Sequence, residues 1–237
     1  MEGLFTTYTK NYYGGNKMSG MNVLKQFGFH TEEEPVSIYP FSPVYRVRGE
    51  EKELIVKKTQ RPIERALRLM KYTATLKENG INIVTPTKLT MANPQTIGDH
   101  TYVAYPFIEG LTYSGTEEEI IEAGELLGEI HALSPTENLF DLEEYNVFDF
   151  NIEEVTKSVQ KIEKNAATYP IKIENDRLKE KLLQFVTQQE ELQNCRLTYI
   201  TTPHDFKANN LIYMPKPYLI DPDNAIWIPR IFDLALA

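Results

Sequence analysis

Apolar residues in the first half of the chain occur in short runs that Pro and Gly residues interrupt, a pattern typical of β-strands. Three runs, at residues 36–39, 44–48 and 53–57, are rich in β-branched and aromatic residues. We expect them to form a three-stranded antiparallel meander. Two further runs, around residues 87–91 and 101–108, predict additional strands joined by Asn-Pro and Gly-Asp turns.

Other segments place apolar residues at the spacing of an amphipathic helix. The predicted helix at residues 116–133 starts with a Thr-Glu-Glu-Glu sequence, which predicts an N-cap and capping box. It contains Gly128 in its interior, where we expect another helix to approach closely, and His131, which we expect to be a hydrogen-bonded core residue. The predicted helices cover residues 21–29, 63–78, 116–133, 153–164 and 175–191.

Near the C-terminus, the apolar runs 211–213 and 218–220 flank a Pro-Lys-Pro turn and predict a tight β-hairpin. Asp205 and Asn210 precede the first run, and Asp221 follows the second, so the hairpin would gather these side chains at one end. Their oxygen atoms suit a hard cation and a hydroxyl group to be deprotonated. The same residue types are also ordinary turn residues that bond to nearby backbone, and the hairpin alone leaves both interpretations open.

The spacing of Asp205, Asn210 and Asp221, with Asp-Leu-Ala at residues 233–235, resembles the catalytic segment of the aminoglycoside phosphotransferase and choline kinase family. The resemblance implies an α+β, bilobal, protein-kinase-like fold: an antiparallel β-sheet N-lobe with one long helix, and a mainly helical C-lobe. It also implies that Asp205 is the catalytic base, and that Asn210 and Asp221 hold Mg²⁺. One departure is Pro-His-Asp at residues 203–205, where the family usually has His-Gly-Asp.

The same resemblance assigns the nucleotide site. Lys57, at the end of the third predicted strand, would bind nucleotide phosphates, with Lys58 as the alternative in the other strand register. Glu64 would pair with that lysine, although an acid in the first turn of a helix also complements the helix dipole. The backbone near Phe107 and Ile108 would contact the adenine edge. Without the resemblance, both lysines read as solvated residues at a strand end.

Composition narrows the function classes. The chain has 237 residues, a net charge of −9 and a pI of about 5.1, which argues against nucleic-acid binding and is compatible with a cationic substrate. Its one cysteine, Cys195, excludes an intramolecular disulfide and fits a reducing compartment. The sequence shows neither a membrane-length apolar run nor a signal-peptide pattern. We expect a cytoplasmic protein with no nucleic-acid or membrane partner.

These features predict a flexible arm at residues 1–20, a nucleotide-binding lobe at 21–108, and a catalytic and substrate lobe at 109–237 that is shorter than usual for the family. The expected function is an ATP-dependent (or GTP-dependent) O-phosphotransferase that uses Mg²⁺ and acts on a hydroxyl of a small cationic molecule, such as an aminoglycoside or amino alcohol. The alternative is a catalytically weak, kinase-like binding protein of the spore-coat type. Three features favour it: Pro-His-Asp at residues 203–205, the absence of a glycine-rich loop, and the short C-terminus. The apolar residues of the last turn also predict self-association.

Overall fold

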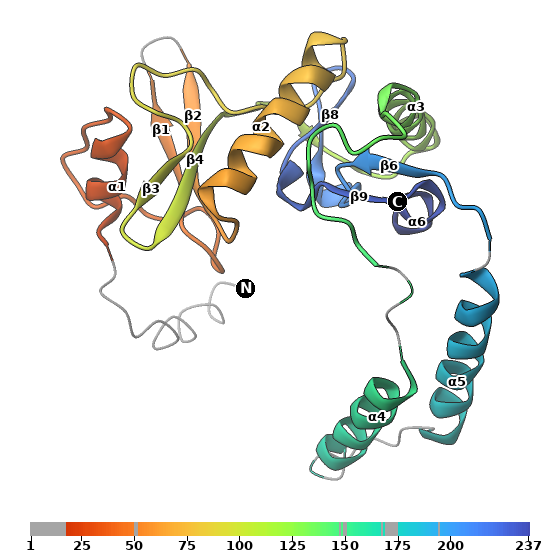
Figure 1. Ribbon diagram of the computed structural model, residues 1–237. Helices are drawn as coiled ribbons and strands as arrows, with labels where there is room; N and C mark the ends of the chain where they lie inside the picture. The colour runs from red at the N-terminus through yellow and green to blue at the C-terminus, as the bar shows by residue number, and fades with distance from the viewer. Residues whose placement is uncertain are drawn as a thin grey trace.

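The computed structural model describes residues 18–49, 52–146, 148, 151–166, 168, 175–193 and 195–237, so most of the predicted arm lies outside the described residues. The chain forms two lobes on either side of a long helix (Figure 1). The first lobe contains a four-stranded antiparallel sheet in the order β1-β2-β4-β3. Its elements are α1 (Gly20–Gln26), β1 (Val44–Arg48), β2 (Glu53–Thr59), α2 (Ile63–Glu78), β3 (Gln95–Ile97) and β4 (His100–Pro106).

One face of this sheet is covered by α1. Tyr45 and Val47 alternate with exposed arginines along β1, because successive strand residues point to opposite faces. The buried pair packs with Val23, Leu24 and Phe27 of α1, all at most 3% exposed. The opposite face turns towards α2 and the second lobe, and it carries the side chain of Lys57.

Two of the predicted strands do not form. Residues 36–39 are a loop, because the Ser37 hydroxyl accepts from the Val44 N–H at 3.0 Å and donates to the Tyr39 carbonyl at 2.7 Å. Residues 87–91 are also a loop, and the strand lies at β3 instead. The Asn93 side chain bonds the Thr87 carbonyl and both the N–H and the carbonyl of Ala104, and the Thr87 N–H donates to the same Ala104 carbonyl. The predicted meander is therefore wrong, since β2 pairs with β1 and β4.

The second lobe contains two small sheets and three of the long helices. Strands β5 (Leu111–Thr112), β7 (Leu211–Tyr213) and β8 (Pro217–Leu219) form one sheet, and β6 (Tyr199–Thr202) pairs with β9 (Ile226–Pro229) in the other. The predicted hairpin is confirmed as β7–β8, with Leu211 opposite Leu219. The remaining elements are α3 (Glu117–Leu133), α4 (Ile152–Ala166), α5 (Asn175–Leu192), α6 (Arg230–Leu236) and the short 3₁₀ turns η1 (Ala208–Asn210) and η2 (Pro222–Asn224).

The largest core cluster holds the lobes together. Leu69, Tyr72 and Leu76 of α2 pack with apolar side chains of α3 and of the β7–β8 hairpin. Burying large apolar side chains contributes roughly 1.5–3 kcal/mol each. Helix α2 is therefore anchored on both sides, which fixes its first turn beside the loops that connect β6 to β7 and β8 to β9.

Helix α3 shows two confirmed expectations and one wrong one. Its capping box forms between Thr116 and Glu119, and His131 is buried with Nε2 2.6 Å from Asp233 Oδ2, as expected for a core histidine. The expected helix contact at Gly128 is absent, because within the described residues no atom lies within 4 Å of a Cβ built there. That side of α3 faces open space.

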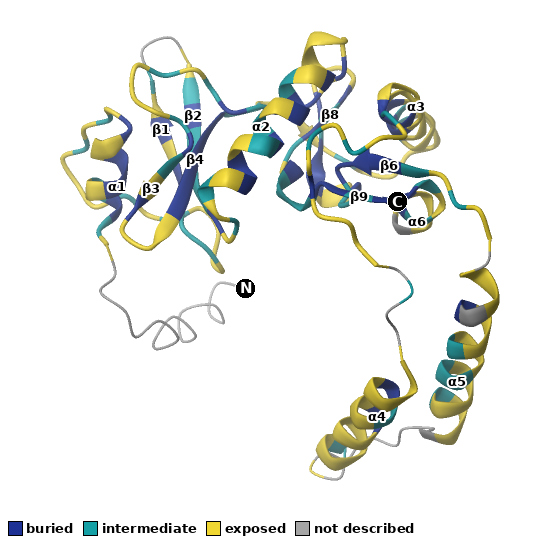
Figure 2. Cartoon of the chain, in the orientation of Figure 1, coloured by how far each residue is buried: buried dark blue, intermediate teal, exposed yellow. Residues whose placement is uncertain are grey.

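Helices α4 and α5 pack against each other and extend away from the body of the protein (Figure 1). Most of their residues are exposed, as the predicted solvated faces require (Figure 2). Of the helices that the structure describes, none combines the length and apolar character that a bilayer span needs.

Candidate active site

Asp205 lies in a tight turn between β6 and η1. His204, directly before it, has a φ of 63°, in the left-handed region that Gly adopts without strain. The turn is held by three bonds: the His204 N–H donates to Thr202 Oγ1 at 3.3 Å, the Asp205 N–H donates to the Pro203 carbonyl at 2.8 Å, and Asn210 Nδ2 donates to the Asp205 carbonyl at 2.9 Å. The family's usual Gly therefore corresponds to a position where the backbone of this chain is left-handed.

The carboxylate of Asp205 accepts several hydrogen bonds. Asn224 Nδ2 lies 3.1 Å and Asn210 Nδ2 3.2 Å from Oδ2, and Lys207 Nζ lies 2.9 Å from the same oxygen. Burial opposes ionisation of this carboxyl, but the hydrogen bonds from Lys207 and Asn224 outweigh it, so the pKa of Asp205 is lowered from its ordinary value. Asp205 is ionised at neutral pH and can accept a hydrogen bond from a hydroxyl.

Lys57 of β2 faces the loop that follows β8. Its Nζ lies 2.6 Å from Asp221 Oδ1 and 3.1 Å from Asp223 Oδ2, and the Tyr105 hydroxyl is hydrogen-bonded to Asp223 Oδ1 at 3.1 Å. Burial would lower the pKa of Lys57, but the charges of Asp223 and Asp221 outweigh it and the pKa is raised. The lysine is therefore charged, and its ammonium group bridges two carboxylates.

The hairpin joins these two groups of residues. The Ile220 N–H donates to the Asn210 carbonyl at 2.8 Å, which places Asp221 directly beside Asn210. The structure thus brings Lys57, Asp205, Asn210 and Asp221 to one region between the lobes.

Two parts of the predicted nucleotide site are arranged differently. Glu64 is exposed on α2, and within the described residues the ion-pair partners of Lys57 are Asp221 and Asp223, so the expected Lys57–Glu64 pair does not form. The Phe107 N–H donates to the Glu53 carbonyl at 2.9 Å and is therefore engaged in the sheet. Ile108 packs against the cluster that contains Val103 and Tyr105.

Four residues of the site were not predicted. Asp223 and Asn224 follow Asp221, and the signal for them was the polar Asp-Pro-Asp-Asn run itself. Arg65 is 0% exposed on α2, hydrogen-bonded to the Ala225 carbonyl and ion-paired with Glu143. Arg61 bonds Asn224. An arginine beside a predicted helix start carries no sequence signal for such a contact, because arginines are mostly exposed.

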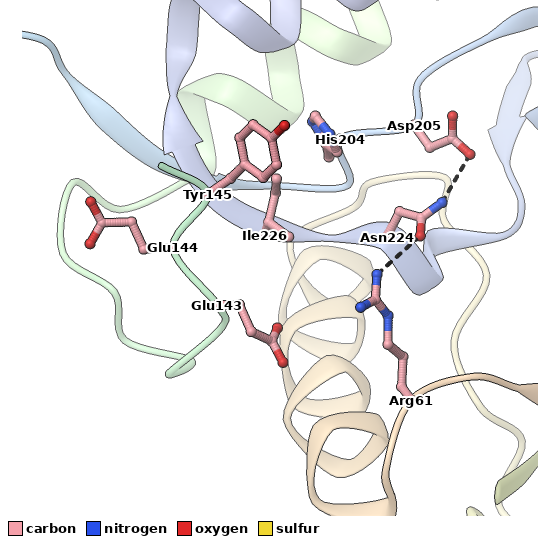
Figure 3. Close-up of a pocket in the computed structure, with 8 residues that line it drawn as sticks. All are labelled: Arg61, Glu143, Glu144, Tyr145, His204, Asp205, Asn224 and Ile226. Carbon is pink, nitrogen blue, oxygen red and sulfur yellow. Dashed lines mark hydrogen bonds between the residues drawn. The ribbon is translucent and has the colours of Figure 1, made fainter. Parts of the chain in front are cut away.

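A cavity of about 520 Å³ opens beside Asp205 (Figure 3). Its wall combines the turn after β6, the η2 turn, the start of β9, the segment before α2 and the segment between α3 and α4. The lining residues are Arg61, Glu143, Glu144, Tyr145, His204, Asp205, Asn224 and Ile226. A small molecule in this space can place a hydroxyl against the Asp205 carboxylate.

The residues around Asp221 fit a hard cation. Both hydrogen bonds from Asn210 Nδ2 go to Asp205, which leaves Asn210 Oδ1 as the atom able to bind a cation. Asp221 and Asp223 already share the positive charge of Lys57. Among the described residues, no group of three His, Cys, Asp or Glu side chains is arranged to hold a metal, so a bound Mg²⁺ would need further ligands from phosphates or water, as is usual for this ion.

Comparisons with known proteins agree with this geometry. The model of the phosphotransferase enzyme family matches residues 41–237. A spectinomycin phosphotransferase solved with ADP and spectinomycin is 17% identical, with a TM-score of 0.62, and the match covers 91% of this chain and 71% of that one. A microcompartment-associated aminopropanol kinase is 13% identical, with a TM-score of 0.60, and the match covers 92% of this chain and 72% of that one. A choline kinase from Streptococcus pneumoniae is 14% identical, with a TM-score of 0.57, and the match covers 92% of this chain and 73% of that one.

The comparison with curated proteins found no match. At these identities the solved structures establish the fold, and the predicted kinase-like α+β fold is confirmed. The family match spans more than half of the sequence and includes Lys57, Asp205, Asn210 and Asp221. The chain therefore belongs to the phosphotransferase enzyme family.

Proposed function

We propose that this protein transfers the terminal phosphoryl group of ATP to a hydroxyl group of a small molecule. The observation that carries the proposal is the ionised Asp205 carboxylate, which lies in the wall of the cavity and next to the Lys57–Asp221 pair. Phosphoryl transfer depends mainly on positioning and on electrostatic stabilisation, and this arrangement supplies both. Asp205 orients the acceptor hydroxyl and takes its proton, while Lys57 neutralises charge on the phosphates.

Asn210 and Asp221 are the residues that would hold Mg²⁺, with Asp223 beside them. When bound, Mg²⁺ neutralises charge on nucleotide phosphate oxygens. Two contacts hold the candidate ligands in place. The Tyr105 hydroxyl orients Asp223, and the backbone hydrogen bond between Ile220 and Asn210 keeps the Asn210 side chain and the Asp221 carboxylate adjacent. GTP in place of ATP would use the same phosphate contacts.

The acceptor that fits the cavity is cationic. Glu143, Glu144 and Asp205 contribute carboxylates to the wall, and Tyr145 offers an aromatic ring, which attracts cations. Arg65 and Arg68 offset Glu143, and the Glu144 side chain points away from Asp205 (Figure 3), so Asp205 is the carboxylate nearest to an amine-bearing acceptor. The solved relatives described above are kinases named for spectinomycin, aminopropanol and choline, which supports an amino alcohol or aminoglycoside for this chain.

The test combines nucleotide binding and turnover. We expect Mg·ATP to raise the melting temperature, since a ligand at 100 times its Kd stabilises the folded state by about 2.7 kcal/mol. A panel of aminoglycosides, amino alcohols and neutral polyols, assayed with labelled ATP, should show transfer to the amine-bearing acceptors only. Transfer to polyols at equal rates would contradict the cationic acceptor, and no nucleotide binding at millimolar concentration would contradict the enzyme.

A second candidate is a kinase-like binding protein with weak or no catalysis. It is favoured by the Phe107 N–H, which is engaged with Glu53 and so is not free for an adenine edge, and by Lys57, which two carboxylates already neutralise. Under this alternative the melting temperature stays constant when Mg·ATP is added, and the parent and an Asp205→Asn variant bind the same molecules.

A further inference from the structure

The side-chain amide of Asn224 contacts both lobes. Its Nδ2 donates to Asp205 Oδ2 at 3.1 Å, and its Oδ1 accepts from Arg61 Nη2 at 3.3 Å (Figure 3). Arg61 lies two residues before the start of α2, so this chain of contacts runs from the first lobe through the η2 turn to the catalytic loop. The sequence separation between Arg61 and Asn224 is 163 residues.

Arg61 determines which way this amide faces. A guanidinium group donates hydrogen bonds and accepts none, so the Asn224 side chain must turn its oxygen towards Arg61. Its NH₂ group then has to face Asp205. Without Arg61, the amide could rotate by half a turn and place its own oxygen against the carboxylate, where two acceptors repel.

A second arginine holds the same turn through its backbone. Arg65, one helical turn further along α2, is buried, is hydrogen-bonded to the Ala225 carbonyl and is ion-paired with Glu143 in the cavity wall. The η2 turn is thus fixed at two consecutive residues, by its side chain at Asn224 and by its backbone at Ala225. This leaves the Asn224 amide little freedom other than rotation about its own side-chain bonds.

The hydrogen bonds at Asp205 are unequal between its two oxygens. Oδ2 accepts from Asn210, Asn224 and Lys207, whereas the contact recorded at Oδ1 is with Lys207 alone. Lys207 is about half exposed, while each of the two amides makes a second hydrogen bond, Asn210 to the Asp205 carbonyl and Asn224 to Arg61. Because Oδ2 is saturated, Oδ1 is the oxygen left to accept a hydrogen bond from an acceptor hydroxyl.

We propose that Asn224 and Arg61 are positioning residues for phosphoryl transfer, which hold Asp205 with Oδ1 towards the acceptor and couple that orientation to the first lobe. The inference rests on the proposed function, since it assigns Asp205 to the acceptor hydroxyl. The Asn224 amide bonds Asp205 directly, and Arg61 reaches Asp205 through Asn224, so both act through Asp205.

The kinetic test uses Asn224→Ala, Arg61→Met, the double variant and the conservative Arg61→Lys. We expect each of the first two to lower kcat about tenfold, in line with the sensitivity of catalysis to small displacements, with little change in KM for ATP. The double variant should lose no more than the worse single variant, because the two residues act in one chain. Arg61→Lys keeps a donor and should recover most of kcat. Arg196→Met, an exposed arginine beyond α5, is the matched control.

A spectroscopic measurement tests the same contact without turnover. The ¹H–¹⁵N signal of the Asn224 side-chain amide is identified by its loss in Asn224→Ala. It should move in Arg61→Met, move less in Arg61→Lys and stay in place in Arg196→Met, with thermal unfolding of each variant showing that it is folded. An unmoved signal in Arg61→Met overturns the proposal, as does a fall in kcat that is additive in the double variant. If the parent shows no transfer to any acceptor, the proposed function fails, and the signal alone decides the link between Arg61 and Asn224.

Discussion

Single residues of the candidate site gain their properties from their partners, some close and some far away in the sequence. Asp205 is a turn residue by sequence, and the amides of Asn210 and Asn224 together with Lys207 make it an ionised, oriented carboxylate. Lys57 is a strand-end lysine by sequence, and Asp221 and Asp223 hold its charge between the lobes. Each of these effects is electrostatic and acts over about 3 Å, so it is sensitive to substitutions that keep the shape of a side chain and change its charge.

Asp205→Asn should lower kcat by about 10²- to 10⁴-fold, the usual contribution of a positioned general base. The amide keeps the size of the side chain but cannot take a proton from the acceptor hydroxyl. Affinity for Mg·ATP, measured by calorimetry, should stay close to that of the parent, because Lys57 and Asp221 are unchanged. Asp99→Asn, at an exposed turn, serves as the control. Turnover within about tenfold of the parent would show that Asp205 is not the base.

Asp221→Ala should weaken nucleotide binding when magnesium is present. The substitution removes a carboxylate oxygen from the candidate cation site, and loss of outer-shell partners alone costs about 10- to 100-fold in metal affinity. The same titration in EDTA is the internal control, since without the metal the variant should bind ATP no more weakly than the parent, because Lys57 loses a competing carboxylate. Equal Mg·ATP affinity in both proteins would make Asp221 a turn residue and an ion-pair partner of Lys57 only.

At the scale of elements, helix α3 is well specified at its ends and weakly supported along one side. The Thr116–Glu119 capping box fixes its start, and the His131–Asp233 bond attaches its last turn to α6. In between, Gly124 and Gly128 face open space within the described residues, although Gly costs about 0.5–1 kcal/mol relative to Ala in a helix interior. These glycines do not serve local stability.

Gly128→Ala should therefore stabilise the protein by about 0.5–1 kcal/mol in urea denaturation, because a methyl group meets no atom and the unfolded chain loses freedom. The matched control is Gly110→Ala, which should destabilise the fold because its Cβ would overlap the Tyr213 carbonyl oxygen. Destabilisation by Gly128→Ala would indicate that another surface packs against this side of α3 in solution.

At the scale of the molecule, α3 and α6 lie beside each other and both expose apolar side chains. Ile121 is 56% and Leu234 is 51% exposed, and Ile120, Leu133 and Ile231 are exposed as well. The contacts of His131 with Asp233, and of its carbonyl with Arg230, place the end of α3 against α6. Contiguous apolar surface of several hundred Å² commonly marks an association site.

We therefore expect the 237-residue chain to self-associate as its concentration rises, with light scattering showing masses above that of the monomer. The variant Ile121→Lys/Leu234→Lys should shift the protein towards monomer. Ser158→Lys/Gln160→Lys on the exposed side of α4 changes the net charge equally without removing apolar surface, and it should behave as the parent. A parent that stays monomeric at all concentrations would rule out association through these helices.

Local order was predictable from the sequence alone. The helices, the Thr116 capping box and the β7–β8 hairpin depend on periodicity, caps and turn residues within a few positions, and all formed near the predicted bounds. The spacing of Asp205, Asn210 and Asp221 indicated the family for a similar reason: all three residues lie in the short segments that flank one hairpin. Short-range patterns determine such features because the interactions behind them are themselves short-range in sequence.

The tertiary structure decided which residues meet. Ser37 and Asn93 took backbone bonds that strands would otherwise have formed, so two predicted strands became loops. On α2, the packing of the helix between the lobes turned Arg65 inwards and left Glu64 in solvent. Neighbouring residues lie about 100° apart around a helix, so a rotation of the helix by that angle would exchange the two environments. Arg61 reached Asn224 across 163 residues, because folding places the first turn of α2 beside the η2 turn. No local pattern encodes such a contact, since its energy depends on distance in space and is independent of distance along the chain.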